Sequence, residues 1–175
     1  MLILRDMKES DIEDYVRWFT TNTEWLNWDS PWENSISTAS LELKIWTNYY
    51  EFVKSLGNDV VRKKYEIEAD GLHIGWICSY YDLGYMENKD GIPAIGIDIP
   101  SIDGRNNGYG TKAFKMYIDY LKGHGYNSFY TQTWSGNEAM LRVAEKLGFK
   151  EVYRKKDYRV VNDKKYDAVT FRLDL

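Results

Sequence analysis

The sequence predicts a mixed α/β fold of 175 residues, with a central twisted mixed sheet of about seven strands flanked by about four helices. Stretches in which apolar residues alternate with period two, typical of strands, are interspersed with stretches of helical periodicity. An apolar run at 92–99 is followed by an amphipathic helix and a further strand, which predicts a helical crossover between neighbouring strands. The chain has 3 prolines and no Pro/Ser-rich linker, so we expect a single domain over residues 1–175.

Turn and cap residues indicate where the elements begin and end. Asp70-Gly71 and Asn162-Asp163 are two-residue turns that predict hairpins. Ser10 with Glu13, and Ser135 with Glu138, form capping-box patterns at two helix starts. In order, the sequence predicts a strand at 2–7, a helix around 12–19, a loop or broken helix at 21–35, a helix at 41–56, strands at 61–69, 72–81 and 92–99, a helix around 113–121, a strand at 128–134, a helix through 140–147, and strands at 149–161 and 165–175.

Composition excludes several classes of protein. The 23 basic and 27 acidic side chains give a net charge of −4, whereas a protein that neutralises nucleic-acid phosphates is basic. The single cysteine, Cys78, cannot form an internal disulfide, and with 2 histidines we expect no metal site. Charges begin at Arg5, and no apolar run is long enough to cross a membrane. We therefore expect a cytoplasmic protein with no nucleic-acid or membrane partner.

The segment Arg105-Asn106-Asn107-Gly108-Tyr109-Gly110, between a strand and a helix, carries the strongest functional signal. Its glycines let the backbone approach a ligand closely where the first N–H groups of a helix are free. With the positive end of the helix dipole, such a loop can hold a phosphate or pyrophosphate. A turn with left-handed glycines explains the same residues equally well. The segment matches neither a Walker loop nor a dinucleotide fingerprint.

The pattern Arg-x-x-Gly-x-Gly in this context resembles the acetyl-coenzyme A signature of the GNAT family of N-acetyltransferases. Two further stretches, Trp134-Ser135-Gly136-Asn137 and Glu145-Lys146-Leu147-Gly148-Phe149, resemble that family's second motif. The predicted order of elements is similar to the family fold over nearly the whole chain. The resemblance implies an acyltransferase that uses acetyl-CoA as cosubstrate and no metal.

The resemblance places the coenzyme where the strand 92–99 diverges from the strand 128–134. Backbone N–H groups of 106–111 would hold its pyrophosphate, and the strand edge at 97–99 would bind its pantetheine arm. Asn137 would reach the pantetheine or the sulfur. Lys146 would meet the adenosine phosphates, although a lysine near a helix end is more often a solvated partner of the dipole. The implied coenzyme contacts are Ile97, Ile99, Arg105, Asn106, Asn107, Gly108, Tyr109, Gly110, Thr111, Asn137 and Lys146.

Acyl transfer to an amine needs a group that removes a proton from the ammonium, whose pKa is about 10. Asp98, in an apolar run before the coenzyme loop, is the candidate base, and the Ile99 N–H is the candidate donor to the developing oxyanion. The alternation of side chains along a strand leaves open that Asp98 points away from the site. Many family members have a tyrosine as general acid where this chain has Ala144. A catalytically weak coenzyme-binding sensor is therefore one alternative, and a domain that binds another nucleotide through the same loop is a second.

The acceptor residues are expected in an acidic segment at 24–33, which holds three of the 7 tryptophans. Rings and carboxylates favour a cationic amine, although packing of the rings over the sheet is the alternative. The expected acceptor contacts are Trp25, Trp28, Asp29, Glu33 and Tyr80. The stretches 79–84 and 96–98 resemble aminoglycoside 6′-N-acetyltransferases, whereas 134–149 resembles relatives of the ribosomal-protein acetyltransferases. An aminoglycoside-like or polyamine-like amine and a protein N-terminus therefore stay open, as do a monomer and a homodimer.

Overall fold

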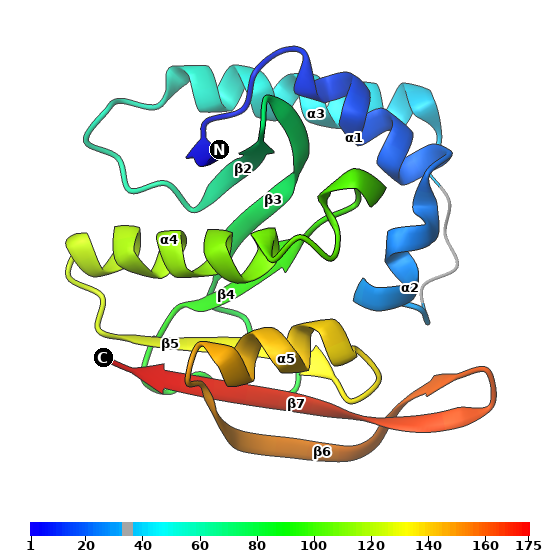
Figure 1. The fold of residues 1–175 in the computed structure, drawn as a ribbon, viewed down its shortest axis with the longest axis vertical. Helices are drawn as coiled ribbons and strands as arrows, with labels where there is room; N and C mark the ends of the chain where they lie inside the picture. The colour runs from blue at the N-terminus through cyan, green and yellow to red at the C-terminus, as the bar shows by residue number, and fades with distance from the viewer. Residues whose placement is uncertain (33–36) are drawn as a thin grey trace.

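Seven strands form one mixed sheet in the order β1-β2-β3-β4-β5-β7-β6, in which β4 and β5 are the parallel neighbours (Figure 1). The computed structural model describes residues 1–32 and 37–175. Within these residues the elements are β1 (Leu2–Arg5), α1 (Asp11–Thr20), η1 (Thr23–Trp25), α2 (Leu26–Asp29), α3 (Ala39–Ser55), β2 (Lys64–Ala69), β3 (Leu72–Tyr80), β4 (Ala94–Asp98), η2 (Ile102–Gly104), α4 (Tyr109–Gly123), β5 (Ser128–Trp134), α5 (Glu138–Lys146), β6 (Lys150–Val161) and β7 (Lys164–Asp174). The predicted mixed α/β sheet is confirmed, and α4 is the crossover helix that joins the parallel pair.

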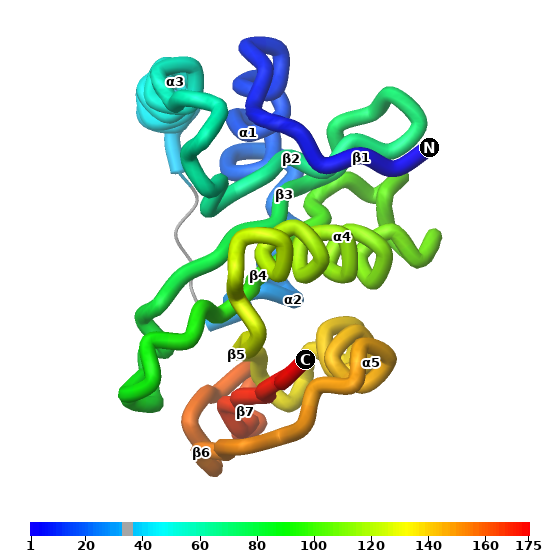
Figure 2. The backbone as a smooth tube through the Cα atoms, turned by 90° about the vertical axis from the view of Figure 1, so that its left-hand side faces the viewer, coloured from blue at the N-terminus to red at the C-terminus, as the bar shows by residue number. Residues whose placement is uncertain are grey.

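Helices cover both faces of the sheet (Figure 2). On one face, α4 and α5 enclose a core in which Phe114, Tyr117 and Phe129 are fully buried. On the other face, α1 and α3 enclose a second core that includes Tyr15 and Trp76. Neighbouring residues of a strand point to opposite faces, so a residue of β3 or β4 belongs to one core or to the other. Side chains on the two faces of β3 and β4 therefore contact different helices.

Neither predicted capping box forms. Ser10 has helical backbone angles and makes no side-chain cap bond, because a capping side chain needs a non-helical backbone to reach the first-turn N–H groups. At α5 the cap is Asn137, whose Oδ1 accepts from the Met140 N–H at 3.0 Å. The Ser135 hydroxyl instead accepts from a backbone N–H of β7 at 3.0 Å. Both predictions were wrong because spacing to a glutamate does not determine the direction of the serine side chain.

The parallel pairing of β4 with β5 stops almost as soon as it begins. The registered pair is Ala94 with Tyr130, next to a 2.9 Å backbone hydrogen bond from the Tyr130 N–H to the Pro93 carbonyl. One residue further, the Ile95 carbonyl accepts from the hydroxyl of buried Thr131 at 2.8 Å. No further registered pair follows within the described ranges. The two central strands therefore open like a V, with Thr131 at its apex.

We predict that Thr131→Val destabilises the protein by about 1–3 kcal/mol, because it leaves the buried Ile95 carbonyl without a donor while preserving the side-chain shape. Urea denaturation would measure the free energy of unfolding. Thr133→Val is the matched control on the same strand, since the Thr133 side chain makes no hydrogen bond to another described residue and is only half-buried. Equal losses in the two variants would contradict the role of Thr131.

Candidate functional site

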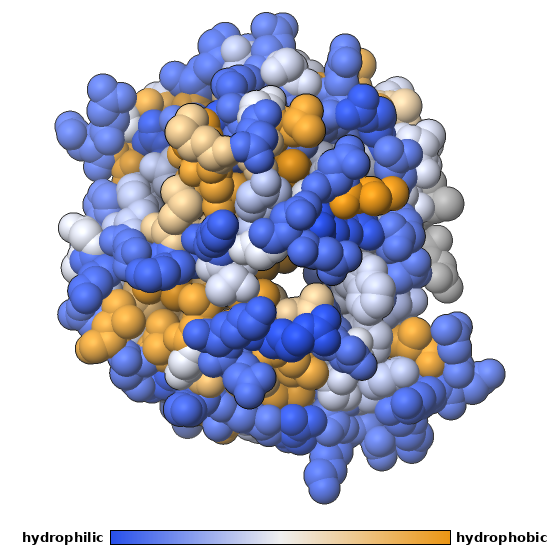
Figure 3. All heavy atoms as spheres, in the orientation of Figure 1, coloured by the Kyte–Doolittle hydropathy of each residue, from blue (hydrophilic) through white to orange (hydrophobic). Residues whose placement is uncertain are grey.

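The opening between β4 and β5 leaves one backbone edge of β4 unpaired. Along a strand, the N–H and C=O groups of alternate residues face the same neighbour. The Pro93 and Ile95 carbonyls face β5, so the backbone groups of Ile97 and the Ile99 N–H face the opening, whereas the Ile99 carbonyl accepts from Arg105. Figure 3 shows a hole through the molecule at this place, between the first turn of α4 and α5. This edge can accept an extended chain with amide groups.

The loop before α4 has the geometry of an anion site. Gly108 precedes the helix with φ of 74°, a left-handed conformation that favours glycine. Gly108 has no side chain to cap the helix, so the first-turn N–H groups, from Tyr109 to Thr111, lack a side-chain cap and intrahelical partners. A Cβ added at Gly108 would meet no atom within 4 Å, and one at Gly110 would meet only Ile99 Cδ1 at 3.5 Å. Free donors beside open space fit a pyrophosphate.

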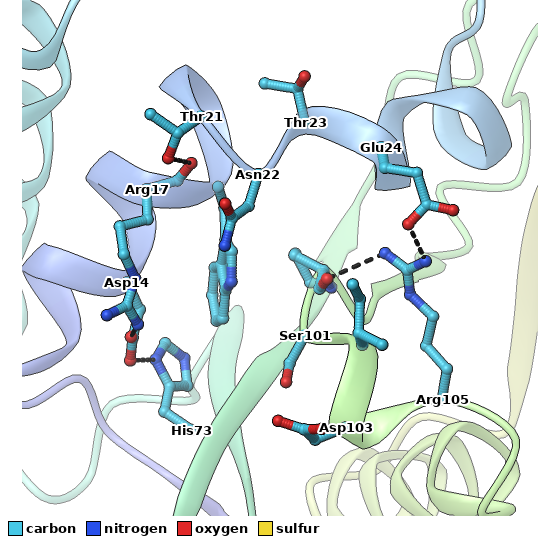
Figure 4. Close-up of a pocket in the computed structure, with 13 residues that line it drawn as sticks. Asp14, Arg17, Thr21, Asn22, Thr23, Glu24, His73, Ser101, Asp103 and Arg105 are labelled. Carbon is cyan, nitrogen blue, oxygen red and sulfur yellow. Dashed lines mark hydrogen bonds and ion pairs between the residues drawn. The ribbon is translucent and has the colours of Figure 1, made fainter.

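Arg105 holds this loop in place with a side chain directed away from the first turn of α4. Its guanidinium donates to the carbonyl of Ile99 at 3.1 Å and to that of Pro100 at 2.9 Å. It also pairs with Glu24 of η1 at 2.6 Å (Figure 4). Arg105 therefore ties the end of β4 to the segment that follows α1, and its contribution to the cradle is structural.

Asn137 and Trp134 tie α2 across the far end of the opening. The Trp134 indole N–H donates to the Trp28 carbonyl at 2.7 Å, and Asn137 Nδ2 donates to the same carbonyl at 2.9 Å. A Cβ added at Gly136 would lie 1.8 Å from the Trp134 ring, so glycine is required beside it. Because its Oδ1 caps α5, Asn137 has both ends of its carboxamide engaged within the protein.

Asp98 lies at the end of β4, on the face that α1 and α3 cover. It is paired in register with Trp76, and directly opposed residues of neighbouring strands share a face. Burial raises the pKa of Asp98 well above the usual range of a carboxyl, and the charge of Asp29 raises it further, while Lys64 and Trp76 act in the opposite direction. The negative charge of Asp29 on α2 therefore acts on Asp98 at the end of β4.

The Lys64 ammonium fills an aromatic cage next to these acids. Its Nζ lies between 4.3 and 5.1 Å from the ring centroids of Tyr15, Trp46, Tyr49 and Trp76. Burial lowers the pKa of Lys64. The carboxylates of Glu66, 3.8 Å away, and of Asp98 raise this pKa and so partly counteract burial. The sequence pattern did not single out this lysine, although three charged residues alternate on one face of β2. The largest group of rings in this core is thus occupied by the protein's own cation.

Trp25 does not line the opening. It is 5% exposed, its indole N–H donates to the Trp18 carbonyl at 2.8 Å, and its ring packs edge-on against Trp76. Trp28, by contrast, is 47% exposed on α2. Trp25 therefore packs over the sheet, which was the alternative to acceptor binding, because its side chain turns inward at the start of α2.

Tyr80 and Lys146 lie in two different places. The Tyr80 ring lies 3.3 Å from the position of a Cβ at Gly96, on the same face of the sheet as Asp98. Lys146 is exposed at the last residue of α5, and Figure 1 shows that α4 and α5 start at the same end, so Lys146 lies far from the cradle. Glu33 lies outside the described residues.

A cavity of about 720 Å³ lies between α1 with η1 on one side and the η2 segment on the other (Figure 4). His73 of β3 lines it and is held between carboxylates, with Nδ1 2.9 Å from Asp14 and Nε2 3.0 Å from Glu66. Asp11, Asp14 and His73 lie close enough together to hold a metal ion, but the Arg5 guanidinium already donates to both oxygens of Asp11. Tyr15 donates to Glu66 at 2.6 Å. The arrangement fits a buried ion-pair network around a protonated histidine.

An open parallel strand pair, with a helix start that presents free N–H groups beside it, defines a coenzyme A-type acyltransferase fold. The model of the acetyltransferase (GNAT) domain matches residues 1–150. The chain therefore belongs to the GNAT family, and it is an acyl-CoA-dependent N-acetyltransferase. The sequence-based assignment to this family is confirmed. No curated protein matches the chain.

Solved structures share the fold over almost the whole chain. A ribosomal-protein-S5-alanine acetyltransferase from Vibrio fischeri superposes with a TM-score of 0.74 at 19% identity, covering 99% of this chain and 92% of that one. A ribosomal L7/L12 alpha-N-protein acetyltransferase in complex with coenzyme A gives 0.73 at 16% identity, covering 99% and 94%. An N-acetyltransferase from Staphylococcus aureus Mu50 gives 0.72 at 16% identity, covering 99% and 98%. Among the described residues, no helix has the length and apolarity needed to cross a membrane.

We predict that the His73 network makes stability depend on pH. Burial alone would lower the pKa of His73, but its hydrogen bonds with Asp14 and Glu66 outweigh burial and raise the pKa to about 9. Because this value exceeds the ordinary 6.5, the stabilisation is fully present below pH 6.5 and is lost as the pH rises through 9. Its size is on the order of 3 kcal/mol.

Urea denaturation at a series of pH values would measure this loss. We expect His73→Gln to be less stable than the natural protein at pH 6 and to lose much less stability between pH 6.5 and 9. Lys122→Gln, which changes an exposed cation in the last turn of α4, is the control. Parallel pH profiles for the natural protein and His73→Gln would contradict the role of the histidine.

Proposed function

We propose that this protein transfers the acetyl group of acetyl-CoA to a primary amine by direct attack in a ternary complex, with Asp98 as the base. The observation that carries the proposal is the position of Asp98. Asp98 lies at the end of β4, beside the backbone edge of Ile97 and the Ile99 N–H, and its pKa is raised by burial and by the charge of Asp29.

The residues around the opening fit the coenzyme. The free N–H groups at the start of α4 suit a pyrophosphate, and the edge of β4 at Ile97 and Ile99 suits the amides of a pantetheine arm. The coenzyme supplies an acetyl thioester, which an amine can attack. We place Asn106, Asn107 and Gly108 in the cradle through their backbone, and Asn137 beside the arm as the group that positions α2.

Asp98 and Asp29 would act on the acceptor amine. Two carboxyl groups in one place attract an ammonium, and the arriving positive charge lowers the pKa that burial and mutual repulsion have raised. A carboxylate with a raised pKa is a better proton acceptor than an ordinary one. The amine would arrive from the side of α1 and α3, because Asp98 lies on that face of the sheet. The Ile99 N–H, directed into the opening, is the donor for charge that develops on the carbonyl oxygen.

Ala144 leaves α5 without the tyrosine that commonly protonates the leaving thiolate. The residue is 1% exposed and packs in the core with α4. A coenzyme thiolate is a good leaving group without a proton, so water is sufficient. A coenzyme-binding sensor without turnover is the second candidate function, and Ala144 is the observation that favours it.

Both acceptor classes stay possible for the transferase. Resemblance of two stretches to aminoglycoside acetyltransferases favours a small cationic amine. Two of the similar structures are acetyltransferases of ribosomal proteins, which favours a protein N-terminus. A thiol-release assay with spermidine, kanamycin and short peptides separates the transferase from the sensor: coenzyme binding without thiol release on any acceptor supports the sensor.

We predict that Gly108→Ala weakens coenzyme binding by about tenfold or more, because a Cβ strains the left-handed conformation by roughly 1–2 kcal/mol and crowds the cradle. Calorimetry with coenzyme A would measure the dissociation constant. Gly84→Ala is the matched control, since Gly84 has φ of 65° with no atom near its added Cβ and lies in the loop after β3. Similar weakening in both variants would argue against the cradle.

We predict that the rate of acetylation rises with pH as Asp98 loses its proton. This rise is the Asp98 limb of the pH–rate profile. Because the pKa of Asp98 is raised and the base acts when ionised, this limb should lie well above pH 4. Asp98→Asn should remove the limb and lower kcat/KM by about 10²–10⁴-fold. Asp29→Asn should move the limb to lower pH, because it removes a negative charge that raises the pKa of Asp98.

Thiol-release rates between pH 5 and 8, with the best acceptor of the panel, test both statements. Asp119→Asn, an exposed aspartate on α4 paired with Lys115, is the charge-matched control and should leave the limb in place. A limb that persists unchanged in Asp98→Asn would refute Asp98 as the base.

A further inference from the structure

Lys64 is a largely buried cation to which the reaction described above assigns no part. Its side chain is 13% exposed, and its Nζ lies 4.3–5.1 Å from the centroids of four rings from α1, α3 and β3. Among the described residues, the carboxylate within 4.0 Å of it is that of Glu66, at 3.8 Å, which is longer than a hydrogen bond. The other oxygen of Glu66 accepts from Tyr15 and lies 3.0 Å from His73. The ion pair with Glu66 therefore neutralises the charge of Lys64 only in part.

The walls of the aromatic cage are fixed by stacking and hydrogen bonds. The helices α1 and α3, which supply three of the four rings, lie side by side at the β2 end of the sheet (Figure 2). Tyr15 and Trp46 stack with their centroids 3.6 Å apart. The Tyr15 hydroxyl donates to Glu66 at 2.6 Å, and the Trp46 indole N–H donates to buried Glu42 at 2.8 Å. The ammonium of Lys64 is therefore a positive charge held in one place.

Trp76 connects this cage to Asp98. On β3 it is paired in register with Glu66 on one side and with Asp98 on the other, so the three side chains lie on one face of the sheet. The Trp76 ring is one wall of the cage, with its centroid 5.1 Å from Lys64 Nζ. Its indole N–H, the one polar group of the side chain, hydrogen-bonds the Asp98 carboxyl and lowers the pKa of that group. One buried ring therefore contacts both the cation and the carboxyl group.

The charge of Lys64 acts on Asp98 in the direction that a base requires. Their attraction lowers the pKa of Asp98 against the effect of burial, and it raises the pKa of Lys64. Within the described part of the chain, the carboxylate that pairs with Lys64 within 4.0 Å is Glu66 and not Asp98. A cation at this remove stabilises the ionised carboxyl group without occupying its oxygens. These oxygens stay open to the proton of an acceptor.

The other titratable groups on this face do not supply Asp98 with positive charge. The charge of Asp29 on α2 raises the pKa of Asp98. Burial raises the pKa of Cys78 to about 12 and also raises that of Tyr80, so both groups of β3 are neutral near pH 7. Further groups on α1, α3, β2 and β3 are either neutral or paired with one another or with arginine or tryptophan, namely Asp11, Asp14, Tyr15, Glu42, Tyr49, Glu66 and His73.

We propose that Lys64 is a positioning residue for acetyl transfer, whose caged ammonium keeps the Asp98 carboxyl group ionised and its oxygens free for the proton of the acceptor. The proposal rests on the proposed function, in which Asp98 is the base. The acceptor ammonium gives a proton to Asp98, the resulting amine forms a bond to the thioester carbonyl carbon, and the coenzyme thiolate leaves. Lys64 keeps its own protons throughout.

Titration of the Asp98 carboxyl group tests the proposal without any acceptor. Carbon-13 NMR of protein labelled at its aspartate carboxyl carbons follows this titration, and the Asp98 signal is the one that Asp98→Asn lacks. Lys64→Met keeps the length of the side chain and removes its charge, so it should raise the pKa of Asp98. Lys64→Arg keeps the charge and should restore the titration of the natural protein. Trp76→Phe keeps a cage wall but removes the indole N–H, so it should also raise the pKa of Asp98.

Lys63→Met is the matched control. Lys63 is exposed and directly precedes Lys64, and neighbouring residues of an extended chain point in opposite directions. The control removes the same charge and should leave the titration of Asp98 unchanged. Lys64→Gln is the second uncharged variant and serves if Lys64→Met does not fold.

Thiol-release rates from acetyl-CoA give the second readout. In Lys64→Met, kcat/KM for the acceptor should fall by about tenfold at pH 6 and by less at pH 8, because loss of a nearby positive charge leaves fewer molecules with Asp98 ionised at the lower pH. The dissociation constant of coenzyme A should not change, since its cradle lies before α4. A purely structural loss would instead lower the rate by the same factor at every pH.

The titration and the rates separate two kinds of failure. An Asp98 titration in Lys64→Met or Lys64→Gln that matches the natural protein would overturn the role of Lys64, as would an equal shift in Lys63→Met or a loss of rate that is independent of pH. Each of these results leaves Asp98 as the base. A pH–rate limb that persists in Asp98→Asn would overturn the proposed function, and the catalytic role of Lys64 with it, whatever the titration shows.

Discussion

The structure depends on one interruption of the sheet, the point where parallel pairing between β4 and β5 gives way to a side-chain hydrogen bond. Thr131 satisfies the Ile95 carbonyl, and from there the strands diverge. An ordinary parallel sheet would use the backbone of Ile97 and Ile99 internally. Here the backbone of Ile97 and the Ile99 N–H face an opening that ends at the free N–H groups of α4, while the Ile99 carbonyl accepts from Arg105. Buried backbone groups are costly when unpaired, so an opening of this kind persists because it is wet or because a ligand pairs with it.

Electrostatics on the α1–α3 face follow from burial of many ionisable groups in one core. Glu66 receives a hydrogen bond from Tyr15 and lies against His73 and Lys64, so its charge is neutralised from several directions. The aromatic cage keeps the Lys64 cation within reach of Asp98 without placing it in the opening. The excess of aromatic residues is therefore largely structural on this face. It stabilises a cation of the protein itself.

The elements on the two sides of Trp134 carry opposite charge. Asp29 and Asp98 lie on the sheet and α2, whereas the β6–β7 hairpin contributes Arg159 and its neighbours. Trp134 links the sides, because its ring packs against Trp32 and its indole N–H holds the Trp28 carbonyl. A mild net charge hides this division, since opposite charges on two elements cancel in the sum.

The amino-acid sequence by itself determined the elements, the glycine loop before α4 and the family, because periodicity, turn residues and Arg-x-x-Gly-x-Gly are local signals. It also marked Asp98 and Asp29 as candidates. Only the tertiary structure decided that Asn137 and not Ser135 caps α5, that Arg105 turns toward Glu24, and that Trp25 packs inward while Trp28 stays exposed. The same holds for the Lys64 cage and for Arg159 over Trp32, which join residues far apart in the chain. Such contacts depend on side-chain direction and on how distant elements pack, and no local pattern encodes either.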